Sequence, residues 1–380
     1  MVPRFACGEP DGEPCDFPSL STGQAVGHTC MTMQKSVCCP IMSESCRVGV
    51  FGASGFAGAE LLRLAAGHPV FEVVLATADS QAGGRAADLY PSLAAAYPDL
   101  PFTAVDPDAA EGLDLVFLAL PHGASQDLVP ELRKRVGAIV DLAADFRLKD
   151  PALYPVWYGE QHHHPELLDE AVFGLPELFG DELPGATLIA AAGCYPTAAA
   201  LALSPLVRSG LVEPSGIVVD AASGVSGAGR AARAHTHFNA VDEDFTAYGL
   251  LDHRHTPEIE QATGASVIFT PHLAPMNRGI LATCYARPAG RAPDPLAVLS
   301  DFYREEPFVV VSDRSPSTKA TLGSNCAHLT ARYDGRTGWV IAIAALDNLT
   351  KGAAGQAIQC ANLALDLPET LGLPIVGVYP

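Results

Sequence analysis

A cysteine among small residues, Cys194, is the residue whose setting most suggests covalent chemistry. It lies in the stretch Ala192-Gly193-Cys194-Tyr195-Pro196-Thr197, between an apolar run that predicts a strand over 186–191 and a run that predicts a helix over 198–207. Pro and Thr suit the first turn of a helix, where unpaired N–H groups and the helix dipole favour a thiolate. The stretch therefore predicts a thiol of lowered pKa that acts as a nucleophile. A buried structural cysteine in a strand-to-helix turn is the alternative.

Two histidines are the candidates to exchange a proton with such a cysteine. His253 and His255 stand just before a helix that Thr256 as N-cap and Pro257 as first helical residue predict. Because histidine titrates near neutral pH, either ring is a candidate acid or base, and we prefer His253 slightly. Sequence reasoning does not distinguish the roles of two histidines that have a single residue between them. The alternative is that both are loop histidines with local hydrogen bonds.

Two arginines are candidates to bind an anionic substrate. The chain has a formal net charge of -20, so an anionic ligand needs local cations. Arg147 follows a predicted strand over 138–142, and Arg230 ends a glycine-rich loop after a predicted strand over 217–222. Guanidinium groups bind carboxylates and phosphates through two parallel hydrogen bonds. We therefore expect an anion near one or both, with ordinary surface ion pairs as the alternative.

A glycine-rich segment near residue 50 predicts a dinucleotide site. It reads Gly52-Ala53-Ser54-Gly55-Phe56-Ala57-Gly58 between a predicted strand over 46–51 and a predicted helix over 59–64, and a second strand follows over 71–76. Glycines there permit a tight turn and close approach of the backbone to a pyrophosphate at the helix N-terminus. The predicted cofactor-binding residues in this segment are Gly52, Ser54, Gly55, Phe56, Ala57 and Gly58.

The end of the second predicted strand bears on the choice of cofactor. NAD-binding proteins place an acidic residue there for the ribose hydroxyls. In this chain Thr77, Ser80 and Arg85 are available to receive a 2′-phosphate, although Asp79 lies between them. The sequence therefore favours NADP(H), with Ser80 as a further cofactor-binding residue.

The remaining pattern predicts an α/β fold: a Rossmann-type dinucleotide-binding domain plus an α+β substrate and dimerisation domain with a mixed sheet. A strand is expected over 113–120, and the loop that follows it, from Pro121 to Ser125, is a ligand-binding candidate. The later predictions are strands at 267–270, 279–286 and 308–311, a hairpin turning at Asp334-Gly335, and a helix over 353–365. The predicted domains are 45–193, completed by 348–380, and 194–347.

Residues 1–44 form a different segment, rich in Gly, Pro, Cys and Ser. Six of the ten cysteines precede Arg47, without the spacing of a zinc site. We expect either a disordered extension or a translation start that is assigned too far upstream, with Met42 as the natural initiator.

The adjacent histidines 162–164 are expected in a loop. Because neighbours in sequence converge poorly as metal ligands, no metal site is predicted. Acidic composition disfavours nucleic acid, no apolar run spans a membrane, and reduced cysteines suit the cytoplasm.

The motifs taken together resemble those of a known family. They are the glycine segment 52–58, Leu120-Pro121-His122-Gly123, Asp145-Phe146-Arg147, Gly193-Cys194-Tyr195-Pro196-Thr197, His253-Arg254-His255-Thr256-Pro257-Glu258 and Asn348-Leu349-Thr350-Lys351-Gly352. Over about residues 46–380 the chain resembles N-acetyl-γ-glutamyl-phosphate reductase, of the semialdehyde dehydrogenase superfamily. Aspartate-semialdehyde dehydrogenase is the alternative, although its cysteine context differs.

The resemblance implies an activity and several residue roles. The family reduces N-acetyl-γ-glutamyl phosphate with NADPH to N-acetyl-glutamate 5-semialdehyde and phosphate, through a cysteine thioester, in arginine biosynthesis. By similarity, Cys194 is the nucleophile, His253 or His255 the acid/base, and Asn348 lies near the nicotinamide. The same resemblance makes Glu258, with Arg147 and Arg230, a substrate-binding candidate, and it implies a homo-oligomer, either a dimer or a tetramer.

Overall fold

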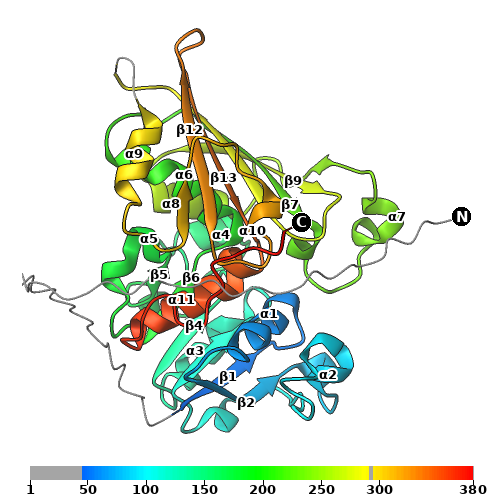
Figure 1. Cartoon of the computed structure of the whole chain (residues 1–380). Coiled ribbons are helices and arrows are strands. Elements are labelled where there is room, and N and C mark those ends of the chain that lie inside the picture. Colours follow the sequence, from blue (N-terminus) through cyan, green and yellow to red (C-terminus); the bar gives the residue numbers. More distant parts are fainter. Residues whose placement is uncertain (1–44, 291–293, 380) are drawn as a thin grey trace, which may run out of the picture. The chain divides into compact units, whose positions relative to one another are not determined.

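The computed structural model describes residues 45–290 and 294–379, and the predicted extension 1–44 lies outside the described residues. Two sheets dominate that part of the chain (Figure 1). Among the described residues, no helix is long and apolar enough to cross a membrane.

The first sheet is parallel and has the strand order β2-β1-β3-β4-β6-β5. Its central strands are short apolar runs, as expected for strands buried on both faces. The carboxyl ends of β1, β3, β4 and β6 lead into the glycine segment, the 121–125 loop, the Arg147 loop and Cys194. The strands are β1 (Cys46–Phe51), β2 (Phe71–Thr77), β3 (Leu115–Leu118), β4 (Ala138–Asp141), β5 (Val172–Gly174) and β6 (Leu188–Ala191).

Helices cover both faces of this sheet. Side chains of α1 (Phe56–Ala65) and α11 (Gly355–Ala364) share one buried core with the strands. Side chains of α3 (Ala124–Leu132) and α4 (Leu153–Trp157) share a second core on the strands. The predicted Rossmann-type domain is therefore confirmed, and its ligand edge is the set of loops at the strands' carboxyl ends.

The second sheet is mixed, with the order β11-β12-β13-β10-β7-β9-β8. Pairs β7/β9 and β11/β12 are parallel, and the other pairs are antiparallel, so the predicted mixed sheet is confirmed. The strands are β7 (Ile217–Gly224), β8 (Thr246–Ala247), β9 (Val267–Ala274), β10 (Ile280–Ala286), β11 (Val309–Val311), β12 (Ala327–Asp334) and β13 (Trp339–Leu346).

Helices cover one face of the mixed sheet, and in the part of the chain that the structure describes the other face, called the uncovered face below, has exposed apolar side chains. Helices α6 (Cys194–Arg208), α8 (Thr256–Thr263) and α9 (Pro295–Phe302) contribute to a buried core over the first face. On the strands, apolar residues exposed to solvent include Ile268 at 54% and Val310 at 42%. The remaining α-helices are short: α2 (Ala86–Leu89), α5 (Pro176–Phe179), α7 (Phe238–Val241) and α10 (Thr318–Thr321).

The C-terminal helix returns to the parallel sheet, where α11 contacts β4 and β6 (red in Figure 1). A π-helical turn, Thr350–Ala354, precedes it. We propose, on these contacts, that residues 348–380 complete the domain formed by 45–193, and that 194–347 form the other domain.

Several predicted helix starts differ from the structure, including those of α1 (predicted at 59, observed at Phe56) and α11 (predicted at 353, observed at Gly355); two others lie beside reactive residues. Helix α6 begins at Cys194 itself, four residues before the predicted start at Ala198, because Gly193 is its N-cap. His255, not Thr256, is the N-cap of α8, so Thr256 and Pro257 occupy the first two helical positions. Both differences bring a reactive side chain closer to a helix N-terminus.

Candidate active site

Side chains from distant parts of the chain meet at Gly193, the residue before the candidate nucleophile. Gly193 donates its N–H to Glu258 Oε1 at 2.6 Å. A Cβ built on Gly193 would lie 2.7 Å from Arg147 Nη1 and 2.8 Å from His255 Nε2, closer than real contacts allow. Only glycine therefore lets these two side chains approach the backbone beside Cys194.

The thiol of Cys194 lies at the first position of α6 and is partly buried. The sequence predicts a lowered pKa there, and that prediction is wrong. Burial raises the pKa of Cys194 to about 11, and the nearby Arg147 guanidinium opposes this rise only in part. Desolvation outweighs both the helix terminus and the cation because it penalises the charged thiolate directly.

The two histidines have different surroundings. His253 Nδ1 accepts the backbone N–H of His255 at 3.1 Å, and its ring lies edge-on to Tyr195 and Tyr248. Among residues 45–290 and 294–379, His255 Nδ1 is buried without a hydrogen-bond partner, while Nε2 faces Gly193. Burial and the nearby Arg254 lower the pKa of His253 to about 4. Burial also holds the pKa of His255 well below its ordinary value, because a protonated ring loses its hydration there.

Glu258, the third substrate-binding candidate, is engaged by the backbone and by Arg147. It is fully buried, and it lines neither of the two cavities described below. Its second carboxylate oxygen lies 3.3 Å from Arg147 Nη1, and Arg147 Nη2 donates to Leu142 O at 2.7 Å. From the first turn of α8, Glu258 therefore holds Gly193 and Arg147 in place, and its substrate-binding role stays a prediction.

A first cavity of about 570 Å³ extends from the glycine segment to Cys194. Most of the predicted cofactor-binding residues line it: Gly52, Ser54, Gly55, Phe56, Ala57, Ser80 and Asn348. Gly58 does not line it but packs behind it, where an added Cβ would lie 2.4 Å from Gly52 O. Gly52 itself has φ +82°, a left-handed conformation that favours glycine.

The cations and polar groups of the first cavity are spread along it. Arg147 lines it next to Cys194, whereas exposed Arg230 donates Nε to Ser54 O of the glycine segment at 2.7 Å. Asn348 accepts the Gly279 N–H at 2.7 Å and donates to Ser226 Oγ at 3.0 Å. The glycine backbone, a cation and a fixed amide side chain match the chemistry of a dinucleotide's phosphates and nicotinamide end.

Two side chains near the predicted 2′-phosphate site are already engaged. Arg85 pairs with Asp88 at 2.9 Å and lines neither cavity. Asp79 accepts the N–H of Val105 at 3.0 Å while lining the first cavity beside Ser80. The structure thus leaves Ser80, rather than Arg85, at the cavity wall.

A second cavity, of about 620 Å³, opens on the other side of the nucleophile. Cys194, His255 and Arg254 line both cavities, and His253 lines only the second. Sequence reasoning missed the other polar residues of this wall, although Arg254 stands between the two predicted histidines. These residues are Ser223, Arg233, His235, Asp244, Thr246, Tyr248 and Arg254.

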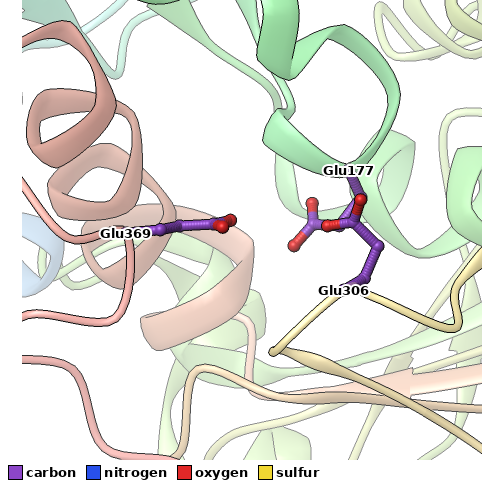
Figure 2. Close-up of side chains that lie close together, drawn as sticks. All are labelled: Glu177, Glu306 and Glu369. Atoms are coloured by element: carbon purple, nitrogen blue, oxygen red, sulfur yellow. The ribbon is translucent and has the colours of Figure 1, made fainter. Parts of the chain in front are cut away.

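The predicted histidine loop 162–164 is observed as irregular backbone. His162 Nε2 lies 2.7 Å from Asp145 O, so this ring is used in local packing. In the part of the chain that the structure describes, the group of potential metal ligands is instead a trio of carboxylates. We call Glu177, Glu306 and Glu369 the carboxylate cluster; their ligand atoms lie within 4.8 Å of one another (Figure 2).

Family models match both halves of the chain. A model described as the semialdehyde dehydrogenase NAD binding domain matches residues 47–186, and one described as the semialdehyde dehydrogenase dimerisation domain matches 194–348. Solved structures with the same fold include aspartate semialdehyde dehydrogenase II of Vibrio cholerae, at a TM-score of 0.64 and 17% identity over 85% of this chain and 99% of that one. The Candida albicans enzyme with NADP has a TM-score of 0.60 and 16% identity, covering 84% and 98%.

Curated relatives are much more similar in sequence. N-acetyl-gamma-glutamyl-phosphate reductase of Salinispora arenicola is 52% identical over 88% of this chain and 99% of its own length. The protein of the same name from Symbiobacterium thermophilum is 49% identical, with the same coverage. The aspartate semialdehyde dehydrogenases share the fold at less than 20% identity. The resemblance to N-acetyl-γ-glutamyl-phosphate reductase is therefore favoured over the resemblance to aspartate-semialdehyde dehydrogenase. The chain belongs to the N-acetyl-gamma-glutamyl-phosphate reductase family of semialdehyde dehydrogenases.

Proposed function

We propose that the chain reduces N-acetyl-γ-glutamyl phosphate to N-acetyl-L-glutamate 5-semialdehyde with release of phosphate, using NADPH, in arginine biosynthesis. The observation that carries this proposal is that Cys194 lines both cavities. A glycine-walled cavity and a second cavity with several polar side chains in its wall thus meet at one thiol. That arrangement lets a group held covalently on sulfur face a hydride donor.

Cys194 Sγ forms the covalent intermediate in this proposal. The thiolate attacks the acyl carbon, the carbon–oxygen bond to phosphate breaks, and a thioester remains on the enzyme. NADPH, when bound, supplies the hydride that reduces this thioester carbon. Collapse of the resulting thiohemiacetal breaks the carbon–sulfur bond, which releases the aldehyde and restores the thiolate.

The contacts of the two histidines suggest separate roles. Because His253 Nδ1 accepts a backbone N–H, its neutral form carries the proton on Nε2, the nitrogen left to hydrogen-bond elsewhere. We assign to His253 Nε2–H the donation of a hydrogen bond to the substrate oxygen. His255, unpaired at Nδ1 and adjacent to Gly193, is then the base that takes the Cys194 proton. This assignment reverses our slight preference from the sequence.

The arginines divide between the two cavities. Arg147, next to Cys194, is placed to bind the phosphate that leaves the acyl group. Arg254 lines both cavities, and with Arg233 it is our candidate for the substrate carboxylate. Arg230 is bonded to the glycine segment and is exposed, so we reassign it from the substrate to the cofactor phosphates.

The family's dimerisation domain covers the mixed sheet. We propose that two copies of the chain associate through the uncovered face of this sheet, because exposed Ile268 and Val310 would be buried there. We place the enzyme in the cytoplasm, where the nucleophile stays reduced; the described cysteines are free thiols.

The test is run in the oxidative direction, with N-acetyl-glutamate semialdehyde, phosphate and NADP. We expect NADPH formation that requires phosphate, and that disappears in Cys194→Ser, because a hydroxyl at that position is a much weaker nucleophile. Aspartate semialdehyde serves as the comparison substrate, and NAD as the comparison cofactor. Full activity in Cys194→Ser would overturn the mechanism, and preference for aspartate semialdehyde would overturn the substrate.

A further inference from the structure

A lysine is buried completely behind the nucleophile without reaching either cavity. Lys351 has no exposed surface, and it is absent from both cavity walls. Its Nζ donates to Glu177 Oε1 at 2.6 Å and to Gln359 Oε1 at 2.8 Å. Buried ion pairs contribute little net stability, because both ions lose hydration, and their best-supported use is to fix one register. Such a use requires that Lys351 hold together segments that are distant in the sequence.

The partners of Lys351 come from separate parts of the chain. Glu177 lies in α5, Glu306 follows α9 and Glu369 follows α11, and Figure 2 shows the three carboxylates of the cluster directed toward one another. Gln359 Nε2 donates to both Glu177 at 3.0 Å and Glu369 at 2.7 Å. The cation at the cluster is thus an ammonium of the chain itself. It bonds Glu177 and Gln359, which belong with Lys351 to the domain proposed over 45–193 and 348–380, while Glu306 of the other domain adds a third carboxylate to the cluster.

The residue after Lys351 contacts the nucleophile. Gly352 belongs to the π-helical turn Thr350–Ala354, and an added Cβ on it would lie 2.7 Å from Cys194 Cβ and 3.2 Å from Cys194 Cα. Such turns are rare, and they occur frequently at functional sites. One turn further on, Gln356 Nε2 donates to Thr197 Oγ1 of α6 at 3.0 Å. The backbone that Lys351 anchors is therefore packed directly against Cys194 and its helix.

We propose that Lys351 is a positioning residue for Cys194. Its ion pair with Glu177 fixes the π-helical turn, so that Gly352 lies against the nucleophile and sets the place of the sulfur at the junction of the two cavities. Lys351 acts through Gly352 and touches neither substrate nor cofactor. The proposal rests on the proposed function for its kinetic readout, but its thiol readout is independent of the substrate.

The experiment uses the double variant Lys351→Met/Glu177→Gln, which removes both charges without leaving one buried and unpaired. Lys134→Met is the matched control, because Lys134 is a mostly exposed lysine paired with Glu131. We measure kcat and KM in the phosphate-dependent assay, NADPH affinity, thermal stability, and alkylation of Cys194 against pH by peptide mass spectrometry. Misplacement of a reacting atom by about 1 Å costs about 100-fold in rate, so we expect kcat to fall by about 10- to 100-fold.

The pattern of effects separates positioning from general destabilisation. We expect NADPH affinity and KM to change by less than about threefold, while the midpoint of the Cys194 alkylation profile shifts. A folded double variant with wild-type kcat and an unchanged alkylation profile would overturn the proposal. If the double variant does not fold, Gln359→Met, which removes one acceptor of Lys351 but keeps the ion pair, must show a smaller change of the same kind, and no change overturns the proposal. An inactive wild-type enzyme would refute the proposed function alone.

Discussion

The buried state of Cys194 leads to a prediction about its reactivity in the absence of ligands. Burial raises the thiol pKa to about 11, from an ordinary value near 9. At pH 8 this lowers the thiolate fraction by about 100-fold relative to an exposed cysteine. A more basic thiolate is also more nucleophilic, by roughly 8-fold over two pKa units. Alkylation of Cys194 at pH 8 should therefore be about 10-fold slower than that of an exposed thiol.

The assay follows iodoacetamide labelling of the Cys194 peptide by mass spectrometry from pH 7 to 11.5, with urea-unfolded protein as the reference. In the native protein the rate should still rise above pH 10, whereas the unfolded reference levels off near 9. Arg147→Met should move the native midpoint to higher pH, because the guanidinium favours the thiolate. A native midpoint at or below 9 would refute the argument from burial. A midpoint that Arg147→Met leaves in place would show that this cation does not act on the sulfur.

Three further outcomes are expected. His255→Gln should slow thioester formation by about 100-fold or more in stopped-flow phosphate release, while His253→Gln slows the later reduction step; the reverse pattern would exchange their roles. Gly352→Ala should cut kcat by about 100-fold, because its Cβ meets Cys194 at 2.7 Å, and near wild-type turnover would contradict this packing. Burial and neighbouring carboxylates raise the pKa of Glu306 to about 7, above its unfolded value of about 4.5. The folded protein therefore favours the protonated carboxyl, and the stability that this protonation contributes is lost as pH rises from about 4.5 through 7. Glu306→Gln should therefore make the free energy of unfolding less pH-dependent between pH 5 and 8 in urea titrations, and an unchanged slope would refute it.

Much of the fold was accessible from the sequence because it depends on local rules. The strand β1 has its predicted bounds, and β2, β4 and β10 agree within one residue, since their apolar runs are bounded by turn residues. The glycine segment was recognisable because a tight turn, a left-handed Gly52 and a helix packed at Gly58 leave few alternatives to glycine. Short elements such as β5 and β8 were not predicted, because their pairing partners lie elsewhere in the chain.

The identity of the nucleophile and its neighbours also came from local pattern, whereas their states came from the tertiary structure. Cys194 and the two histidines stand at helix starts, which cap and turn residues mark in any sequence. The direction of the Cys194 pKa shift was predicted wrongly, because desolvation depends on everything that packs around the sulfur. The hydrogen bond from Gly193 to buried Glu258, a contact between residues 65 positions apart, is likewise beyond any local pattern.

What the sequence by itself determined is the set of reactive residues, the glycine-rich cofactor segment and the two kinds of sheet, since backbone sterics and hydrophobic periodicity act over a few residues. What only the tertiary structure decided is which groups meet. Arg254 lines both cavities, and Lys351 reaches Glu177 across 174 positions to hold the turn against Cys194. Those distances and the loss of hydration depend on chain segments far apart in sequence, and no local pattern contains them.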